Sequence, residues 1–155
     1  MKQDIKGIVE QLCMKHGTRN PFEIAKQRNV ILQYEPLGTV RGYYNTAYKQ
    51  KMIHINSDLD GDQQYLVCGH ELGHAIMHPN ANTPFFKAHT LFSVSKLEME
   101  ANRFMIYMTI SDDELLEYAE FPMVQLANVY NVPMDLIKWR YEQLEPHCPD
   151  LDSQT

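Results

Sequence analysis

The pentapeptide His70-Glu71-Leu72-Gly73-His74 constrains the fold of this 155-residue chain more than any other feature. Within a helix, residues four apart lie on the same face, so the imidazoles of His70 and His74 can reach one metal ion. Glu71 lies one residue along and is placed to take a proton from a water at that ion. With 7 histidines in the chain, a chance match to this pattern is expected about 0.02 times. The pattern is typical of a zinc peptidase.

The residues around the motif predict a buried helix that begins after Asp60 and ends near His78. Asp60 has a glutamine three residues later, which is a capping-box pattern, and a proline follows the predicted end. The segment is apolar nearly all round, as in a buried helix. Burying two imidazoles and a carboxylate is costly unless something pairs with them, which favours a metal site. Gly69 and Gly73 each cost about 1 kcal/mol of helix propensity, so we expect another element, such as a strand, to pack closely there.

Hydrophobic periodicity over the whole chain predicts a mostly helical α+β fold in a single domain over residues 1–145. Three strands are expected to form a small antiparallel sheet packed on the motif helix. They cover residues 30–34, 40–44 and 51–56. Other helices are expected at residues 2–16, 22–27, 95–110, 111–118, 122–130 and 133–144. The C-terminal helical part, 111–145, ends in a helical hairpin, residues 80–94 form a polar-aromatic loop, and residues 146–155 form a disordered tail.

Charge and composition argue against nucleic acid or a membrane as the ligand. The net charge is −6, which is the wrong sign for a surface that neutralises phosphates. The N-terminal residues lack the continuous apolar core of a signal peptide or a membrane anchor. Three scattered cysteines give neither a C-x-x-C pair nor a disulfide framework, so a reducing cytoplasm is the expected location.

A zinc peptidase of this type needs three protein ligands, and Glu98 is the favoured third one. It shares a face of the helix predicted at 95–110 with Asn102, which is placed to hold a ligating His ring or Glu98 itself. A carboxylate in the first turns of a helix is also favoured by the macrodipole, so spacing alone does not decide its role. Glu100 points about 200° away from Glu98 and is expected in solvent. His78 is too far along the motif helix to complete a tetrahedron and is expected to pack at its end.

Peptide hydrolysis also requires a donor to the tetrahedral oxyanion. The sequence offers four candidates and does not choose among them: Tyr43, Tyr44, His89 and Arg103. The isolated histidines, His54 among them, are otherwise expected to be surface or core residues. The strand predicted at 40–44 can present its edge to an extended substrate.

Three segments in this order and spacing resemble the ImmA/IrrE family of bacterial and phage metallopeptidases. They are Ile53-His54-Ile55-Asn56, the H-E-L-G-H motif with the trailing His78, and Glu98-Met99-Glu100-Ala101-Asn102-Arg103-Phe104. The resemblance covers residues 1 to about 145 and implies a zincin-like domain. It implies Zn²⁺ as the cofactor, His70, His74 and Glu98 as its ligands, and Glu71 as the catalytic base. Residues 105–110 are bulkier than is usual in the family, which leaves the details of the substrate pocket open.

The resemblance also implies a role. Family members cleave or inactivate a helix-turn-helix repressor, which relieves repression of a prophage, a mobile element or a stress regulon. A zinc-binding anti-repressor that binds the repressor without cutting it would keep the same ligands, so both interpretations stay open. A third alternative is a DNA-binding regulator that uses the C-terminal helix pair. Its second helix has Lys138 and Arg140 but also three acidic residues, and Trp139 needs burial, so the charge is wrong for a recognition helix.

Overall fold

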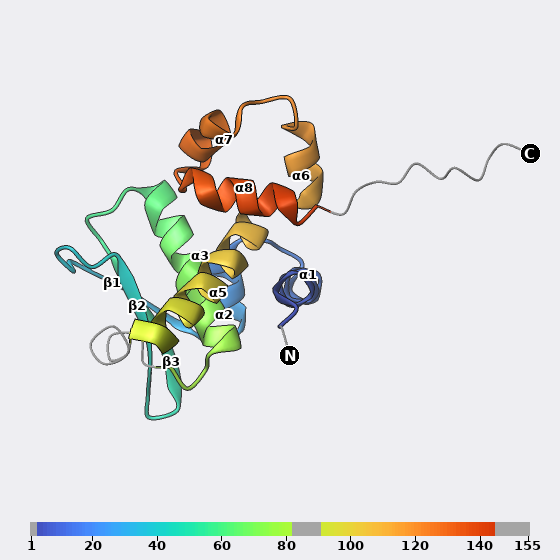
Figure 1. The fold of residues 1–155 in the computed structure, drawn as a ribbon. Coiled ribbons are helices and arrows are strands. Elements are labelled where there is room, and N and C mark those ends of the chain that lie inside the picture. Colours follow the sequence, from blue (N-terminus) through green and yellow to red (C-terminus); the bar gives the residue numbers. More distant parts are fainter. Residues whose placement is uncertain (1–2, 82–90, 145–155) are drawn as a thin grey trace, which may run out of the picture. The chain divides into compact units, whose positions relative to one another are not determined.

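The computed structural model describes residues 3–81 and 91–144. Its contacts divide the chain into two compact units, Met1–Ser111 and Asp112–Thr155, which are described separately (Figure 1). The first unit holds a three-stranded sheet and helices, as the predicted α+β class requires. Its elements are α1 (Ile5–His16), α2 (Pro21–Gln27), β1 (Ile31–Glu35), β2 (Gly42–Ala47), β3 (Gln50–Asn56), α3 (Gly61–Met77) and α5 (Leu91–Thr109). The second unit holds α6 (Asp112–Glu117), α7 (Met123–Tyr130) and α8 (Met134–Glu142).

The sheet is mixed, and the prediction of an antiparallel sheet was wrong. The strand order is β1-β3-β2, with β2 antiparallel and β1 parallel to β3. The last strand in sequence therefore lies in the centre. Burial explains this order: Ile53 and His54 point to opposite faces of β3 and both are buried, as a central strand requires. In β1, by contrast, Ile31 and Tyr34 remain exposed, as suits an edge strand.

The connection between β2 and β3 is tighter than the sequence suggested. Both strands extend to a two-residue turn at Tyr48 and Lys49, where we expected a polar turn over residues 45–50. The φ angles of Tyr48 and Lys49 are 52° and 63°, the left-handed conformation that twisted hairpin turns need at both central positions. Asn-Gly is the usual signal for such a turn, and Tyr-Lys gives none.

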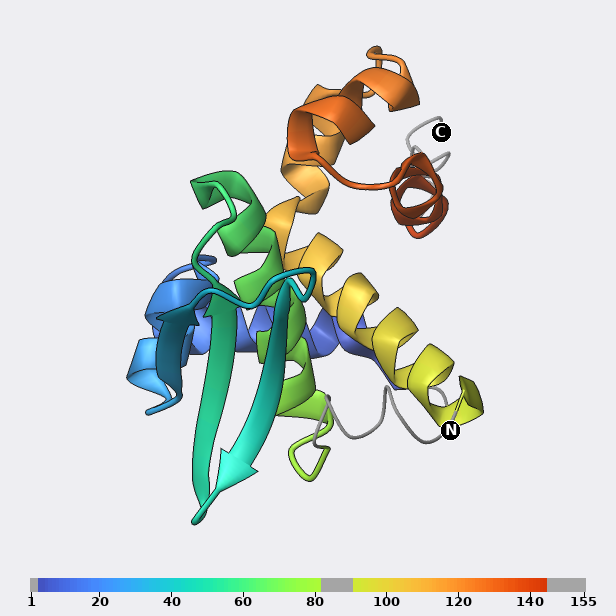
Figure 2. The same cartoon turned by 90° about the vertical axis from the view of Figure 1, so that its left-hand side faces the viewer.

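Helix α3 is the element around which the first unit is built. The side chain of Asp60 accepts a hydrogen bond from the backbone N–H of Gln63 at 2.8 Å, so the predicted N-terminal cap is confirmed. The helix packs against β2 and β3 on one side and against α5 on another (Figure 2). Nearly all of its middle is buried, as its apolar composition predicted.

Gly69 and Gly73, the two glycines in the interior of α3, meet a helix rather than a strand. A Cβ added at Gly69 would lie 3.3 Å from Met105 Cγ, and one added at Gly73 would lie 3.1 Å from Phe104 Cβ. Met105 and Phe104 both belong to α5. The close approach predicted from these glycines is therefore real, and its partner is α5.

The second unit contains the predicted helical hairpin. Helices α7 and α8 are joined through Asn131, whose left-handed backbone (φ 54°) ends α7. On α8, Arg140 is buried and forms an ion pair with Asp112. Among the cations of α8, Lys138 thus remains on the surface, together with Asp135 and Glu142. Across the residues described, no helix is both long and apolar enough to cross a membrane.

The contact between α3 and α5 gives a stability prediction. We expect Gly73→Val to lower the free energy of unfolding by about 1–3 kcal/mol, because the added methyl groups overlap the Phe104 side chain. Urea denaturation measures this change. Gly61→Val is the matched control, because Gly61 is exposed in the first turn of the same helix and a Cβ added there would meet no atom within 4 Å. Equal destabilisation by the two variants would contradict the packing described.

Candidate metal centre

Two helices bring three potential metal ligands together. His70 and His74 lie on α3, and Glu98 lies on α5. Glu98 Oε2 is 3.1 Å from His70 Nε2, and Glu98 Oε1 is 3.1 Å from His74 Nε2. One donor atom from each of the three side chains lies within 4.8 Å of the others. The structure thus places these three residues in one group, which is the set predicted from the sequence.

Asn102 of α5 orients the ring of His70. Its Oδ1 lies 2.8 Å from His70 Nδ1. Because an amide oxygen only accepts, His70 donates from Nδ1. In the neutral ring the lone pair is then on Nε2, which faces Glu98. This is the kind of contact that fixes the tautomer of a ligating histidine.

A longer chain of hydrogen bonds orients His74. Its Nδ1 lies 3.0 Å from His78 Nδ1, and His78 Nε2 lies 3.0 Å from Glu100 Oε2. An ionised Glu100 only accepts, so His78 donates from Nε2 and accepts at Nδ1. His74 must then donate from Nδ1, which leaves the lone pair of its Nε2 facing Glu98. Acceptors on α5 therefore set both tautomers.

The expectation that Glu100 lies in solvent was wrong. Its side chain is 12% exposed and pairs with His78, whose side chain is 7% exposed. His78 is the C-terminal cap of α3, with φ −127° and ψ 55°. His78 leaves the helical path at this point, and its ring reaches Glu100 on α5. The angle between Glu98 and Glu100 around α5 does not predict this contact, because it takes no account of neighbouring helices.

The charges of the group stabilise an ionised Glu98. Burial alone would raise the pKa of Glu98, but hydrogen bonds from His70 and His74 outweigh it and hold the pKa well below its usual range. Burial lowers the pKa of His74. Burial also opposes protonation of His70, but the hydrogen bond to Glu98 and the nearby carboxylates outweigh it and raise that pKa. The site therefore combines a carboxylate that stays negative with two imidazoles beside it.

The donor set fits zinc. Two imidazole nitrogens and one carboxylate are a usual catalytic set, and three protein ligands leave one position for water or substrate. The hydrogen bonds described above turn both Nε2 lone pairs toward the oxygens of Glu98. Each lone pair can either take up a proton, which then bridges the ring to Glu98, or bind a divalent cation between the ring and Glu98.

Glu71 lies on the same helix and outside the group of three. It is buried, with 3% of its surface exposed. On its far side runs β2: a Cβ added at Gly42 would lie 2.5 Å from Val67 Cγ1 and 3.8 Å from Glu71 Cγ. Only a glycine allows the strand to pass this close. Sequence reasoning missed Gly42, although a glycine inside a predicted strand is a signal of close backbone approach.

The four oxyanion candidates differ in their surroundings, and one of them is outside the described residues. The hydroxyl of Tyr44 donates to the carbonyl of Pro79 at 2.9 Å, and it also lies 2.9 Å from Thr46 Oγ1. Arg103 is half-buried on α5. His89 lies outside the described residues. The hydroxyl of Tyr44 is thus engaged at the C-terminal end of α3.

Tyr43 belongs to a cluster on the sheet. Its ring stacks on His54, with ring centroids 4.1 Å apart and 12° between the planes. His54 is buried and lies 2.8 Å from Glu35 Oε1 and 3.0 Å from Asn45 Oδ1. His54 is therefore a core residue with both ring nitrogens bonded, as expected for an isolated histidine.

Comparisons with known proteins agree with this geometry. A peptidase family model described as an IrrE N-terminal-like domain matches residues 25–142. The chain is 40% identical over 135 residues to "Uncharacterized immunity region protein 2" of Bacillus phage phi105, covering 85% of each chain. It is 32% identical over 148 residues to "Metallopeptidase ImmA" of Bacillus subtilis, covering 90% of this chain and 85% of that one.

Among solved structures, a Mycobacterium tuberculosis transcriptional regulator has the same fold over most of this chain. The TM-score is 0.61 at 12% sequence identity, and the match covers 94% of this chain. This chain spans about half of that protein, 49% of its length, so the likeness concerns the fold alone. The family model and the two relatives together show that this chain belongs to the ImmA/IrrE family of metallopeptidases.

Proposed function

We propose that this protein is a zinc-dependent endopeptidase that cleaves a helix-turn-helix repressor in the cytoplasm. Cleavage would relieve repression of a prophage, a mobile element or a stress regulon. One observation carries the proposal: His70, His74 and Glu98 converge, while Glu71 is buried on the same helix outside that group. The peptidase family supports the proposed hydrolysis, and the relative from a phage immunity region supports the proposed role in relieving repression.

In this mechanism His70, His74 and Glu98 hold the zinc ion. Zinc, when bound, supplies Lewis-acid chemistry: it makes a water more acidic and polarises the scissile carbonyl. Glu71 accepts the proton of the attacking water and then delivers it to the leaving amine. Asn102 keeps the His70 ring oriented, and His78 with Glu100 keeps the His74 ring oriented.

The substrate would bind as an added strand. In the sheet described, β2 pairs with β3 on one side, and its other edge takes no strand (Figure 2). An extended peptide can form backbone hydrogen bonds along such an edge. Gly42 brings this strand against Glu71, so a peptide on the edge would run past the proposed base.

A non-cleaving anti-repressor is the alternative. It would bind zinc and the repressor through the same residues but would make no use of a proton acceptor at Glu71. The two proposals therefore differ at this one side chain.

Glu71→Gln separates them. Because the amide cannot accept the proton of a water, we expect peptide cleavage to fall by about 10²–10⁴-fold. Zinc content should stay at the level of the unmodified chain, because Glu71 is outside the ligand group. Cleavage of the purified repressor, followed by gel electrophoresis beside metal analysis, measures both quantities.

Two further variants complete this experiment. His74→Ala should lose zinc and cleavage together, and Glu23→Gln, a change on α2 away from the ligand group, should alter neither. If Glu71→Gln relieves repression as well as the unmodified chain does, the protein acts by binding and the peptidase proposal is wrong.

The hydrogen-bond chain behind His74 gives another prediction. We expect His78→Ala to weaken zinc binding by about 10–100-fold, because the His74 ring loses the partner that fixes its tautomer. Glu100→Gln should bind zinc nearly as well as the unmodified chain, since its amide oxygen still accepts from His78. Competition with a chromophoric chelator measures the affinities, and circular dichroism verifies folding. A folded His78→Ala protein with unchanged zinc affinity would remove this role.

A further inference from the structure

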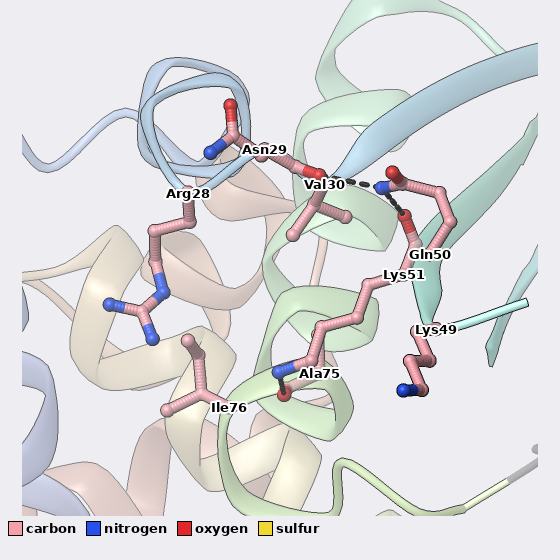
Figure 3. Close-up of a pocket in the computed structure, with 8 residues that line it drawn as sticks. All are labelled: Arg28, Asn29, Val30, Lys49, Gln50, Lys51, Ala75 and Ile76. Atoms are coloured by element: carbon pink, nitrogen blue, oxygen red, sulfur yellow. Dashed lines mark hydrogen bonds between the residues drawn. The ribbon is translucent and has the colours of Figure 1, made fainter.

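A positively charged cavity lies in the first unit, and its lining includes none of the four residues of the proposed centre. It has a volume of about 260 Å³ (Figure 3). Three segments form it: the turn between α2 and β1, the turn that leads into β3, and the last turn of α3. The lining residues are Arg28, Asn29, Val30, Lys49, Gln50, Lys51, Ala75 and Ile76. Three of the eight are cations and none is acidic.

The positive charge of this cavity is only partly compensated. Lys51 Nζ donates to the carbonyl of Ala75 at 3.0 Å, near the C-terminal end of α3. A helix end carries about −0.5 of an elementary charge, which leaves about +2.5 from the three side chains. Within the described residues, no carboxylate forms an ion pair with Arg28, Lys49 or Lys51. The chain as a whole has a net charge of −6, so this local excess runs against the overall charge.

The excess affects Lys51 itself. Burial first, and then the charge of Arg28, lower the pKa of the Lys51 ammonium. Figure 3 shows the Arg28 and Lys51 side chains approaching Ala75 and Ile76 of α3 from opposite sides. The two cations thus face one space and repel each other across it.

Hydrogen bonds from one side chain tie the walls of the cavity together. Gln50 Nε2 donates to the carbonyl of Asn29 at 2.7 Å and to that of Lys51 at 3.0 Å. The first of these bonds joins the turn after α2 to the start of β3. Fixing the backbone of these walls in advance lowers part of the conformational entropy that is lost when a ligand binds.

We propose that this cavity binds a small dianionic oxyanion, namely inorganic phosphate or the phosphate group of a small metabolite. A guanidinium offers paired donors to such a group, and ammonium groups add point charges. A net charge of about +2.5 is balanced better by a dianion than by a ligand with a single negative charge, such as a carboxylate. The volume is below the range of about 300–1,000 Å³ usual for drug-sized ligands, so the ligand is small. This site is independent of the proposed peptidase activity.

Titration of the full-length, zinc-loaded protein with inorganic phosphate tests the proposal. Backbone amide signals from NMR locate the binding site, and chloride keeps the ionic strength constant. We expect saturable shifts at Asn29, residues 49–51 and residues 75–76. Acetate should bind at least ten-fold more weakly than phosphate.

Matched variants separate a specific site from general attraction. Arg28→Gln with Lys49→Gln should weaken phosphate binding at least ten-fold and leave the fold intact, because both side chains are exposed. Lys15→Gln with Lys26→Gln, two exposed cations outside the cavity, should leave the affinity unchanged. Tighter binding of glycerol 3-phosphate would identify a phosphorylated metabolite as the ligand, and equal or weaker binding would identify phosphate itself.

Three results would overturn the proposal. The first is the absence of saturable shifts at the cavity. The second is equal loss of affinity in the two double variants. The third is shifts confined to the surroundings of His70, His74 and Glu98, which would place phosphate on the metal.

Discussion

The close packing of α3 on α5 is the constraint on which the rest of the structure depends. Gly69 and Gly73 let Met105 and Phe104 approach the backbone of α3. That approach brings Glu98 within 3.1 Å of both imidazoles. A larger side chain at either glycine would push α5 away from α3 and so move the Glu98 carboxylate away from the two imidazoles. The two glycines lower the helix propensity of α3, but they allow the close packing that places Glu98 beside His70 and His74.

A single stretch of α5, Glu98 to Asn102, supplies both a ligand and its supports. Glu98 faces the two histidines, while Asn102 and Glu100 accept the hydrogen bonds that set the tautomers of His70 and, through His78, of His74. The network ends at Asn102 and Glu100, and both belong to α5, whose buried face is otherwise apolar. Such a network is costly when only part of it is satisfied, and each ring nitrogen here has a partner. This gives a physical reason for carboxylates at the partly buried positions of Glu98 and Glu100, which an apolar side chain would fill at lower cost.

Local signals in the sequence were enough to predict that these helices exist, and together with the family resemblance they singled out the three candidate ligands that the structure brings together. The Asp60 cap and the H-E-x-x-H spacing act within a few turns of α3, whereas Glu98 lies on a second helix, α5. Features that depend on long-range choices were missed or misread. The strand order follows from which strand can be buried on both faces, and the Tyr48-Lys49 turn has no Asn-Gly signature. Glu100 was assigned to solvent from its angle around α5 relative to Glu98. That angle could not predict that the ring of His78 reaches Glu100 from the end of α3.

The central claim is that His70, His74 and Glu98 hold one zinc ion while Glu71 stays outside the coordination sphere. A crystal structure of the zinc-loaded protein, with anomalous scattering recorded on both sides of the zinc edge, tests it most directly. We predict one ion per chain, bound by Nε2 of both histidines and by an oxygen of Glu98 at about 2.0–2.2 Å. A third protein ligand other than Glu98, such as His78, Glu100 or a cysteine, or direct coordination by Glu71, would contradict it.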